Sequence, residues 1–339
     1  MFHELKEIIQ QAVINQKKGL KSVLATVVHL EGSSYRKPGV RMLISEDLAT
    51  VGAVSGGCVE KEIKHRAKSV FVDNTPKIIT YDGRYKLGCE GILYILIEPI
   101  LITDVLLYHF SDAALKRENL KIESYFVKED EAFGNFGSVI TFHNKKQVSF
   151  SEKFNLQVKN KASLFSQIIQ PRFRLIIIGA EHDAVKLCKI AANLGWEIEV
   201  ITSVKDSKQL IDFDGANSVI GASPETINFK EIEKNTAIVI MNHSYVQDLK
   251  YLISLSAYNP KYIGVLGAPN RRERLFNELF EFVPNISDVF LDAIYTPAGL
   301  HIGAKTPEEI AVSIIAEILS VIHKKEPFSL RKLTGNINN

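Results

Sequence analysis

The sequence has few cysteines, no long apolar run and almost no excess charge, and each shortage excludes a class of protein. Only three cysteines, widely spaced, occur in 339 residues, which argues against a disulfide-rich secreted domain and favours a reducing cytoplasm. No apolar run approaches the roughly 20 residues of a membrane-spanning helix, and residues 1–16 lack the apolar core of a signal peptide. The formal net charge of +2 indicates neither nucleic acid nor an anionic membrane as partner.

What is present is a globular composition, and the first half of the chain predicts an α/β domain. Residues 1–16 have apolar side chains at helical spacing, and strands are expected at 22–30 and 41–44. A helix is expected to begin near Cys58, with an apolar stripe of Ile63, Ala67 and Val70. The short β-branched run 92–97 predicts another strand.

Residues from about 101 to 170 have a weaker pattern. Hairpin strands are expected at 124–128, 138–142 and 147–150, separated by Gly and Asn-Lys-Lys turns. We see no chemistry in this segment. It is interpreted as a β-rich extension that completes a first domain of residues 1–170.

From residue 171 the chain alternates aliphatic strands with helices. This alternation is typical of a doubly wound parallel sheet, so residues 171–325 predict a Rossmann-like domain followed by a tail, 326–339. Its last helix should begin after Thr306 as N-cap, with Pro307 at the first position. The expected strands are 175–178, 197–202, 218–220, 237–241 and 262–266, with an apolar helix over 184–194.

The turn after the first of these strands, Gly179-Ala-Glu-His182-Asp-Ala184, stands where a dinucleotide-binding motif belongs. Its middle glycine is replaced by Glu181, and two like charges about 4 Å apart repel by about 4 kcal/mol at an effective dielectric constant of 20. The acid that usually follows the second strand is also missing, because Thr202 stands there. We therefore expect NAD(P) to bind weakly or not at all.

A glycine- and serine-rich loop with three cations follows the first strand of the chain. Ser33 and Ser34 can expose backbone N–H groups, and Arg36, Lys37 and Arg41 add positive charge. Such a loop suits a phosphate or another oxyanion, although a solvated turn is equally compatible with the spacing. We expect the two arginines to lie in a surface loop, where their replacement should barely affect folding.

The cysteines differ in their surroundings. Cys58 follows Gly56 and Gly57 at the expected start of a helix, where the helix dipole favours a thiolate. Cys89 lies in another glycine turn, and either cysteine could instead be a small buried residue. Cys188 falls in the apolar helix 184–194 and is expected in the core.

The carboxyl ends of later strands carry further polar residues. His243 follows the strand 237–241, and Arg271 and Arg272 follow the strand 262–266. Doubly wound sheets bind ligands at this edge, so the two arginines could meet a phosphate. A glycine-rich loop, 297–303, leads into the last helix.

Taken together, these segments resemble the xanthine dehydrogenase accessory protein family, XdhC/CoxI, over about residues 20–100 and 172–320. The motifs that carry the resemblance are Gly32-Ser-Ser-x-Arg36-x-x-Gly39-x-Arg41-Met42, Gly56-Gly-Cys58-Val-Glu60, Leu87-Gly-Cys89-x-Gly91, Ile97-Glu98-Pro99, Tyr262-Ile-Gly264-x-Leu266-Gly267, Arg271-Arg272, Pro297-x-Gly299-Leu300-x-Ile302-Gly303-Ala304 and Thr306-Pro-Glu-Glu-Ile-Ala-x-Ser-Ile-x-Ala-Glu317. The departures are Glu181 and Ala184 in the dinucleotide turn, the missing acid, Asn242-His243-Ser244 in place of a Thr-His-Asp segment, and Glu90 in place of a glycine.

The resemblance implies an accessory protein rather than the oxidising enzyme. Such proteins bind molybdenum cofactor (molybdopterin or its dinucleotide form), support its sulfuration with a cysteine desulfurase and deliver it to an apo-molybdo-hydroxylase. It implies no catalytic residue, but Cys58 and Cys89 close to the metal or its sulfur. The expected cofactor site comprises Ser33, Ser34, Arg36, Arg41, Gly56, Gly57, Cys58, Cys89, Gly179, His182, His243, Arg271 and Arg272.

Three functions remain open at this point. A transfer protein for molybdenum cofactor is the first, and an NAD(P)-dependent oxidoreductase with an altered nucleotide motif is the second. The third is a scaffold that docks a molybdoenzyme without binding cofactor. A homodimer is compatible with each of them.

Overall fold

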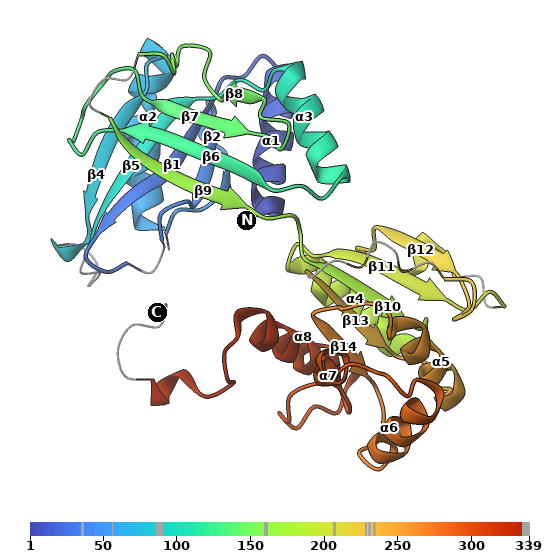
Figure 1. Ribbon diagram of the computed structural model, residues 1–339. Coiled ribbons are helices and arrows are strands. Elements are labelled where there is room, and N and C mark those ends of the chain that lie inside the picture. The colour runs from blue at the N-terminus through green and yellow to red at the C-terminus, as the bar shows by residue number, and fades with distance from the viewer. Residues whose placement is uncertain are drawn as a thin grey trace. The chain divides into compact units, whose positions relative to one another are not determined.

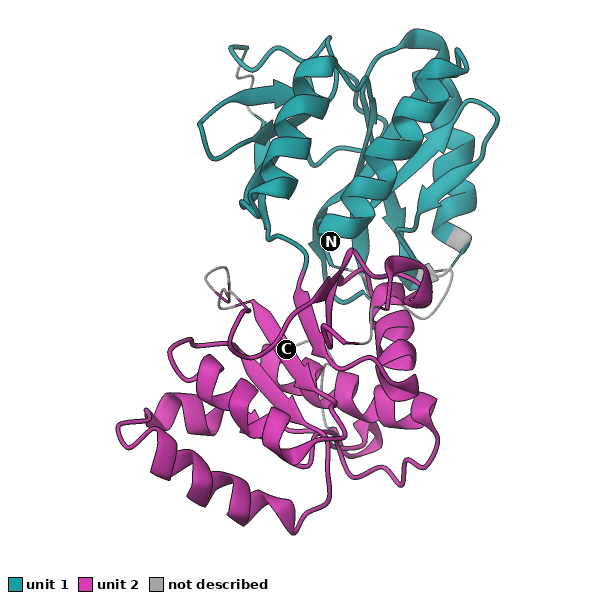
Figure 2. Cartoon of the chain, turned by 90° about the vertical axis from the view of Figure 1, so that its right-hand side faces the viewer, with its two compact units in different colours: residues 1–172 teal, residues 173–339 magenta. Residues whose placement is uncertain are grey.

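The computed structural model describes residues 1–34, 37–55, 57–85, 91–158, 162–205, 208–227, 229, 232 and 235–333, with Cys58 and Tyr85 described by their backbone alone. The chain folds into two compact units, residues 1–172 and 173–339 (Figures 1 and 2). Both units combine helices with sheets, so the expected α/β class is confirmed.

The first unit contains a five-stranded antiparallel sheet in the order β3-β2-β1-β5-β4 (Figure 1). Helix α2 covers one face of it, and its buried stripe Ile63, Ala67 and Val70 is the one that the sequence predicts. The elements are α1 (Phe2–Lys17), β1 (Ser22–Glu31), β2 (Arg41–Ser45), β3 (Thr50–Gly52), α2 (Cys58–Asp73), β4 (Lys77–Asp82) and β5 (Ile92–Pro99).

A second antiparallel sheet, in the order β8-β7-β6-β9, packs with α1 and α3 against the other face. The expected hairpin strands exist, but the first begins at Leu120 rather than at 124. Helix α3 and strand β9 were not predicted, because both expose apolar side chains and therefore lack an amphipathic pattern. The bounds are α3 (Asp104–Leu115), β6 (Leu120–Phe126), β7 (Gly137–Thr141), β8 (Gln147–Ser149) and β9 (Ser163–Ile169).

The second unit is a six-stranded parallel sheet in the order β12-β11-β10-β13-β14-β15, which confirms the Rossmann-like prediction. Helices α4 and α8 pack on one face, where Cys188 is buried as expected, and α5 and α6 pack on the other. The strands are β10 (Arg174–Ile178), β11 (Glu197–Thr202), β12 (Ser218–Gly221), β13 (Thr236–Ile240), β14 (Tyr262–Val265) and β15 (Ile294–Tyr295). The helices are α4 (His182–Asn193), α5 (Tyr245–Leu255), α6 (Arg271–Phe282), α7 (Asp288–Asp292) and α8 (Pro307–His323).

The cap of the last helix is the one that the sequence predicts. The hydroxyl of Thr306 accepts a hydrogen bond from the Glu309 amide at 3.3 Å, and the Glu309 carboxylate accepts one from the Thr306 amide at 3.0 Å. Pro307 occupies the first helical position. Among the residues that the structure describes, no helix has the length and apolar character needed to cross a bilayer.

Candidate functional site

The glycine loops of the first unit leave the same end of its five-stranded sheet. Glu31, the last residue of β1, pairs with Ile92, the first residue of β5, and Ile92 also pairs with Asp82 at the end of β4. Gly52, at the end of β3, pairs with Met42 near the start of β2. Strands β1, β3 and β4 therefore all run toward this end of the sheet, and the start of α2 follows the last residue of β3 by six positions.

Two of these loops touch at Gly91. A Cβ atom built on Gly91 would lie 2.5 Å from the carbonyl oxygen of Ser33, so no larger residue fits without displacing the backbone. The Gly83 amide also donates to the Gly91 carbonyl at 3.0 Å. The structure thus brings Ser33 and Gly91 together, while Arg36, Gly56 and Cys89 lie outside the described residues.

Glu60, which the sequence analysis did not assign to the site, folds the third loop onto the start of α2. Its carboxylate accepts hydrogen bonds from the Ser55 amide at 2.6 Å, the Ser55 hydroxyl at 2.8 Å and the Gly57 amide at 2.7 Å. Burial raises the pKa of Glu60, but these hydrogen bonds outweigh it and hold the pKa below its ordinary value. The Gly57 amide, expected to face a ligand, is therefore bonded to Glu60. The sequence signal was a glutamate three residues after the N-cap position.

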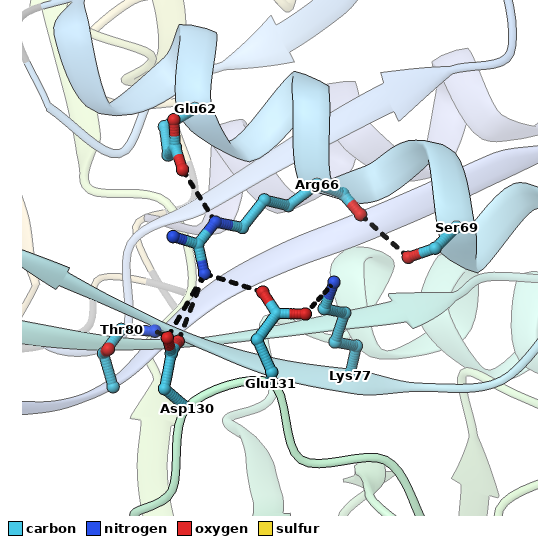
Figure 3. A network of polar contacts seen from close by, with 7 residues as sticks. All are labelled: Glu62, Arg66, Ser69, Lys77, Thr80, Asp130 and Glu131. Carbon is cyan, nitrogen blue, oxygen red and sulfur yellow. Dashed lines mark hydrogen bonds and ion pairs between the residues drawn. The ribbon is translucent and has the colours of Figure 1, made fainter.

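The backbone places Cys58 at the first position of α2, as predicted. An ion-pair network holds this helix in place by joining α2 to β4 and to the loop between β6 and β7 (Figure 3). Arg66 lies 2.7 Å from Glu62 within the helix, and 2.7 Å and 3.2 Å from Glu131 and Asp130 in the loop. Helix α2 is therefore held by ion pairs in its middle as well as by the Glu60 contacts at its start.

Arg41 lies in the interior of the first unit rather than in the surface loop that we expected. It begins β2 and is 9% exposed, so the expected position in a surface loop is wrong, and with it the reason for expecting that its replacement barely affects folding. Its Nη1 donates to the Gly39 carbonyl at 2.9 Å and to the Gln167 side chain in β9 at 2.7 Å, while its Nε and Nη2 are buried with no hydrogen-bond partner among the described residues. Burial lowers the pKa of Arg41 to about 10, against the opposing effect of Glu98. Arg41 thus joins the two sheets of the unit.

Glu98, on β5, is the acidic member of this interior cluster. It is fully buried and accepts hydrogen bonds from the Ser138 amide at 2.8 Å and the Ser138 hydroxyl at 2.5 Å. Burial raises the pKa of Glu98 to about 7, although Ser138 and Arg41 act in the opposite direction. This carboxyl group is therefore close to its titration point at neutral pH.

An aromatic and ionic cluster near the end of β1 was missed by sequence reasoning. The His29 ring lies 5.5 Å from the Tyr94 ring, and its Nε2 lies 3.7 Å from a Glu31 carboxylate oxygen. Lys128 lies 3.7 Å from the same oxygen. Burial and Lys128 lower the pKa of His29. The cluster depends on the pairing of β1 with β5, which no local pattern reveals.

The second unit has its own candidate region, at the carboxyl ends of β10 and β13. Gly179 has a φ of 135°, and a Cβ built on it would lie 2.7 Å from the Met241 carbonyl oxygen, so the turn requires glycine. His182 begins α4 and His243 follows β13, and both are exposed. Glu181 is exposed at the N-cap of α4. The strand order reverses between β10 and β13, which is where doubly wound sheets bind ligands.

Arg271 is held by a buried acid that the sequence analysis did not single out. Its Nη2 lies 2.8 Å from Asp248, which is fully buried on α5. Burial raises the pKa of Asp248 to about 6, against the effects of Arg271, Asn242 and His243. Part of the Arg271 guanidinium is therefore bound within the fold. The Arg272 side chain is exposed, and its guanidinium carbon lies 5.7 Å from the centre of the Phe276 ring.

Within the described part of the chain, no group of three or more His, Cys, Asp or Glu side chains could hold a metal ion. The expected metal contact falls on Cys89, outside the described residues, and on the Cys58 side chain, whose backbone alone is described.

Comparison with protein families and characterised sequences gives a consistent result. The family model of the XdhC and CoxI family matches residues 16–82, and that of the XdhC Rossmann domain matches residues 175–318. A Bacillus subtilis protein, named as a probable subunit of xanthine dehydrogenase, is 32% identical over 88% of this chain and 92% of its own length. The Escherichia coli molybdenum cofactor insertion chaperone PaoD is 23% identical over 95% of this chain and 90% of its own.

A solved structure is similar over nearly the whole chain. A crystal structure described as a xanthine dehydrogenase from Bacillus halodurans is 26% identical, covers 94% of this chain and 96% of its own, and superimposes with a TM-score of 0.75.

Proposed function

The chain belongs to the XdhC and CoxI family, and from this membership we propose that it binds molybdenum cofactor and passes it to an apo-molybdo-hydroxylase. The similarity that carries the proposal most directly is to the cofactor insertion chaperone PaoD, because it extends over both units. The protein is an accessory protein in this proposal, not the oxidising enzyme. The names of the Bacillus relatives favour a partner of the xanthine dehydrogenase type.

The loop end of the first unit is the proposed place of cofactor contact. The connection after β3 leads into Cys58, the first residue of α2, and β1 and β4 end toward the same side of the sheet. A helix N-terminus stabilises a thiolate, a soft ligand for a metal and for its sulfur. Glu60 fixes the turn before Cys58, so it acts as a positioning residue.

The phosphate contact is proposed for the loop between β1 and β2 without Arg41. Arg41 is interior and bonded to Gly39 and Gln167, so it cannot clamp a phosphate from outside the fold without rearrangement. Ser33, Ser34 and Arg36, in the loop between β1 and β2, remain the proposed contacts. In the second unit Gly179, His182, His243 and Arg272 remain proposed contacts for a nucleotide portion of the cofactor.

The test is purification from a host that makes molybdenum cofactor, followed by analysis of metal and pterin. We expect the wild-type protein to carry pterin and Cys58→Ala to carry much less. Cys188→Ala is the matched control, because it removes a thiol from the core of the other unit. Absence of pterin above background in the wild-type protein would refute cofactor binding.

One observation favours the alternative of an NAD(P)-dependent oxidoreductase. The turn after β10 requires glycine at position 179, as the first position of a dinucleotide-binding motif does. Against it stands Glu181, whose carboxylate repels a pyrophosphate, and the proposal therefore keeps the transfer function first.

A further inference from the structure

The carboxylate of Glu31 is held loosely at the end of β1. Its Oε1 lies 3.7 Å from His29 Nε2 and 3.7 Å from Lys128 Nζ, and both distances exceed that of a hydrogen bond. Burial raises the pKa of the Tyr94 phenol, and the charge of Glu31 and a hydrogen bond to it raise this pKa further. A carboxylate has about four acceptor positions, so Glu31, whose side chain is 45% exposed, can still accept from N–H donors of a ligand.

Aromatic rings adjoin this carboxylate. The His29 ring lies 5.5 Å from the Tyr94 ring and 6.3 Å from the Phe126 ring, to which it is inclined by 29°. The His29 side chain is 32% exposed and Tyr94 is half-buried, so part of each ring faces outward. A planar heterocycle can therefore lie against these rings while its edge meets the Glu31 carboxylate.

Glu31 lies next to the loop in which the phosphate contacts are proposed. It is the last residue of β1, and Ser33 follows it by two positions. The carbonyl oxygens of Glu31 and Ser33 both lie beside Gly91, at 3.0 Å and 2.5 Å from a Cβ atom built there. A ligand that has a ring and a phosphate needs a contact for each, and Glu31 and Ser33 are neighbours that can supply them.

The chemistry of a carboxylate selects the kind of ring. A carboxylate only accepts hydrogen bonds, so it binds an edge that has adjacent N–H donors. The pterin of molybdenum cofactor has such an edge, formed by its 2-amino group and the neighbouring ring N–H. We propose that Glu31 binds this edge and that Tyr94 and His29 pack against the ring. The proposal rests on the proposed function and names the residues that hold the heterocycle rather than the phosphate.

The test is isothermal titration calorimetry of the full-length protein with free pterin and with lumazine, in which an oxo group replaces the 2-amino group. An oxo group is an acceptor and is repelled by a carboxylate, so the wild type should bind pterin at least about tenfold more tightly. Glu31→Gln can turn its amide NH₂ toward the oxo group, so this preference should fall to about twofold or less. The matched control is Glu152→Gln, at an exposed glutamate beside the start of β1, which should keep the wild-type preference.

Purification from a cofactor-producing host distinguishes failure of this proposal from failure of the proposed function. Glu31→Gln with an unchanged thermal melt should carry at least about tenfold less pterin than the wild type. If Glu31→Gln carries as much pterin as the wild type, the proposal is overturned and the proposed function stands. Binding of lumazine by the wild type as tightly as pterin also overturns it, and so does tighter binding of guanosine, which has the same edge of N–H donors. Absence of pterin from the wild type refutes the proposed function itself, and this proposal with it.

Discussion

The buried carboxyl group of Glu98 makes the stability of the first unit depend on pH in a predictable direction. In the unfolded chain Glu98 titrates near 4.5, whereas burial raises its pKa to about 7 in the folded state. The folded protein therefore holds this proton more tightly than the unfolded chain does. The stabilisation is complete below the unfolded pKa and is lost as the pH rises through the folded one.

The size of the effect follows from the two pKa values. A rise from 4.5 to about 7 corresponds to about 3 kcal/mol, the free energy of unfolding that Glu98 removes between pH 4.5 and pH 8. For a unit of 172 residues this equals roughly 6 to 12 °C in melting temperature.

Glu98→Gln should remove this dependence. The amide keeps the shape of the carboxyl group, its oxygen can accept from the Ser138 amide, and its NH₂ can donate to the Ser138 hydroxyl. We expect the variant to match the wild type near pH 5 and to exceed it near pH 8. Glu152→Gln, at an exposed glutamate, is the control for the change of charge.

The assay can separate the two units because the single tryptophan, Trp196, lies in the second. Its fluorescence follows that unit, whereas far-UV circular dichroism follows both. The pH-dependent change should appear in circular dichroism and leave the Trp196 transition in place. If the melting temperatures of the wild type and of Glu98→Gln changed with pH in the same way, the assignment of a raised pKa to Glu98 would be refuted.

Three further predictions concern single residues. Arg41→Ala should destabilise the first unit by about 1–3 kcal/mol in urea denaturation, because it leaves the Gly39 carbonyl and the Gln167 side chain without their hydrogen-bond partner; a change below about 0.5 kcal/mol would contradict the interior role. Alkylation at mildly acidic pH, read by mass spectrometry, should modify Cys58 before Cys188, since burial raises the pKa of the Cys188 thiol to about 11; equal modification would argue against a helix-activated thiolate. Calorimetric titration should find no saturable NAD(P) binding below the millimolar range, and Glu181→Gly should strengthen any phosphate binding there; micromolar binding by the wild type would favour the oxidoreductase instead.

Local patterns predicted the second unit better than the first, for a physical reason. Strand β10 is a continuous aliphatic run, and α8 begins with a Thr306 capping box, so neighbours in sequence determine both. Helix α3 exposes Leu107, Tyr108 and Leu115 beside its polar residues, so its sequence shows no clear division into an apolar and a polar face. Its place depends on contacts such as the stacking of Phe110 on Phe2, which lie far apart in sequence.

The candidate site also has features that the local sequence predicts and features that depend on residues far away in the chain. The glycine motifs are visible in the sequence, but the common end at which they lie depends on the pairing of β1 with β5. The interior position of Arg41 depends in the same way on Gln167, 126 residues away. A glycine-rich, cationic stretch looks exposed when read alone, because the sequence does not show which strand will cover it. Asp248 was not identified from the sequence for a similar reason, because its partner Arg271 lies on another helix.

The central claim is that this chain carries molybdenum cofactor to a molybdo-hydroxylase. The most direct measurement is the activity recovered when a cofactor-free xanthine dehydrogenase-type enzyme is mixed with this protein after purification from a cofactor-producing host. The account predicts that the wild-type protein and Cys188→Ala restore activity, and that folded Cys58→Ala restores little. Equal recovery with Cys58→Ala would exclude Cys58 from the transfer, and no recovery with a pterin-loaded wild-type protein would contradict delivery itself.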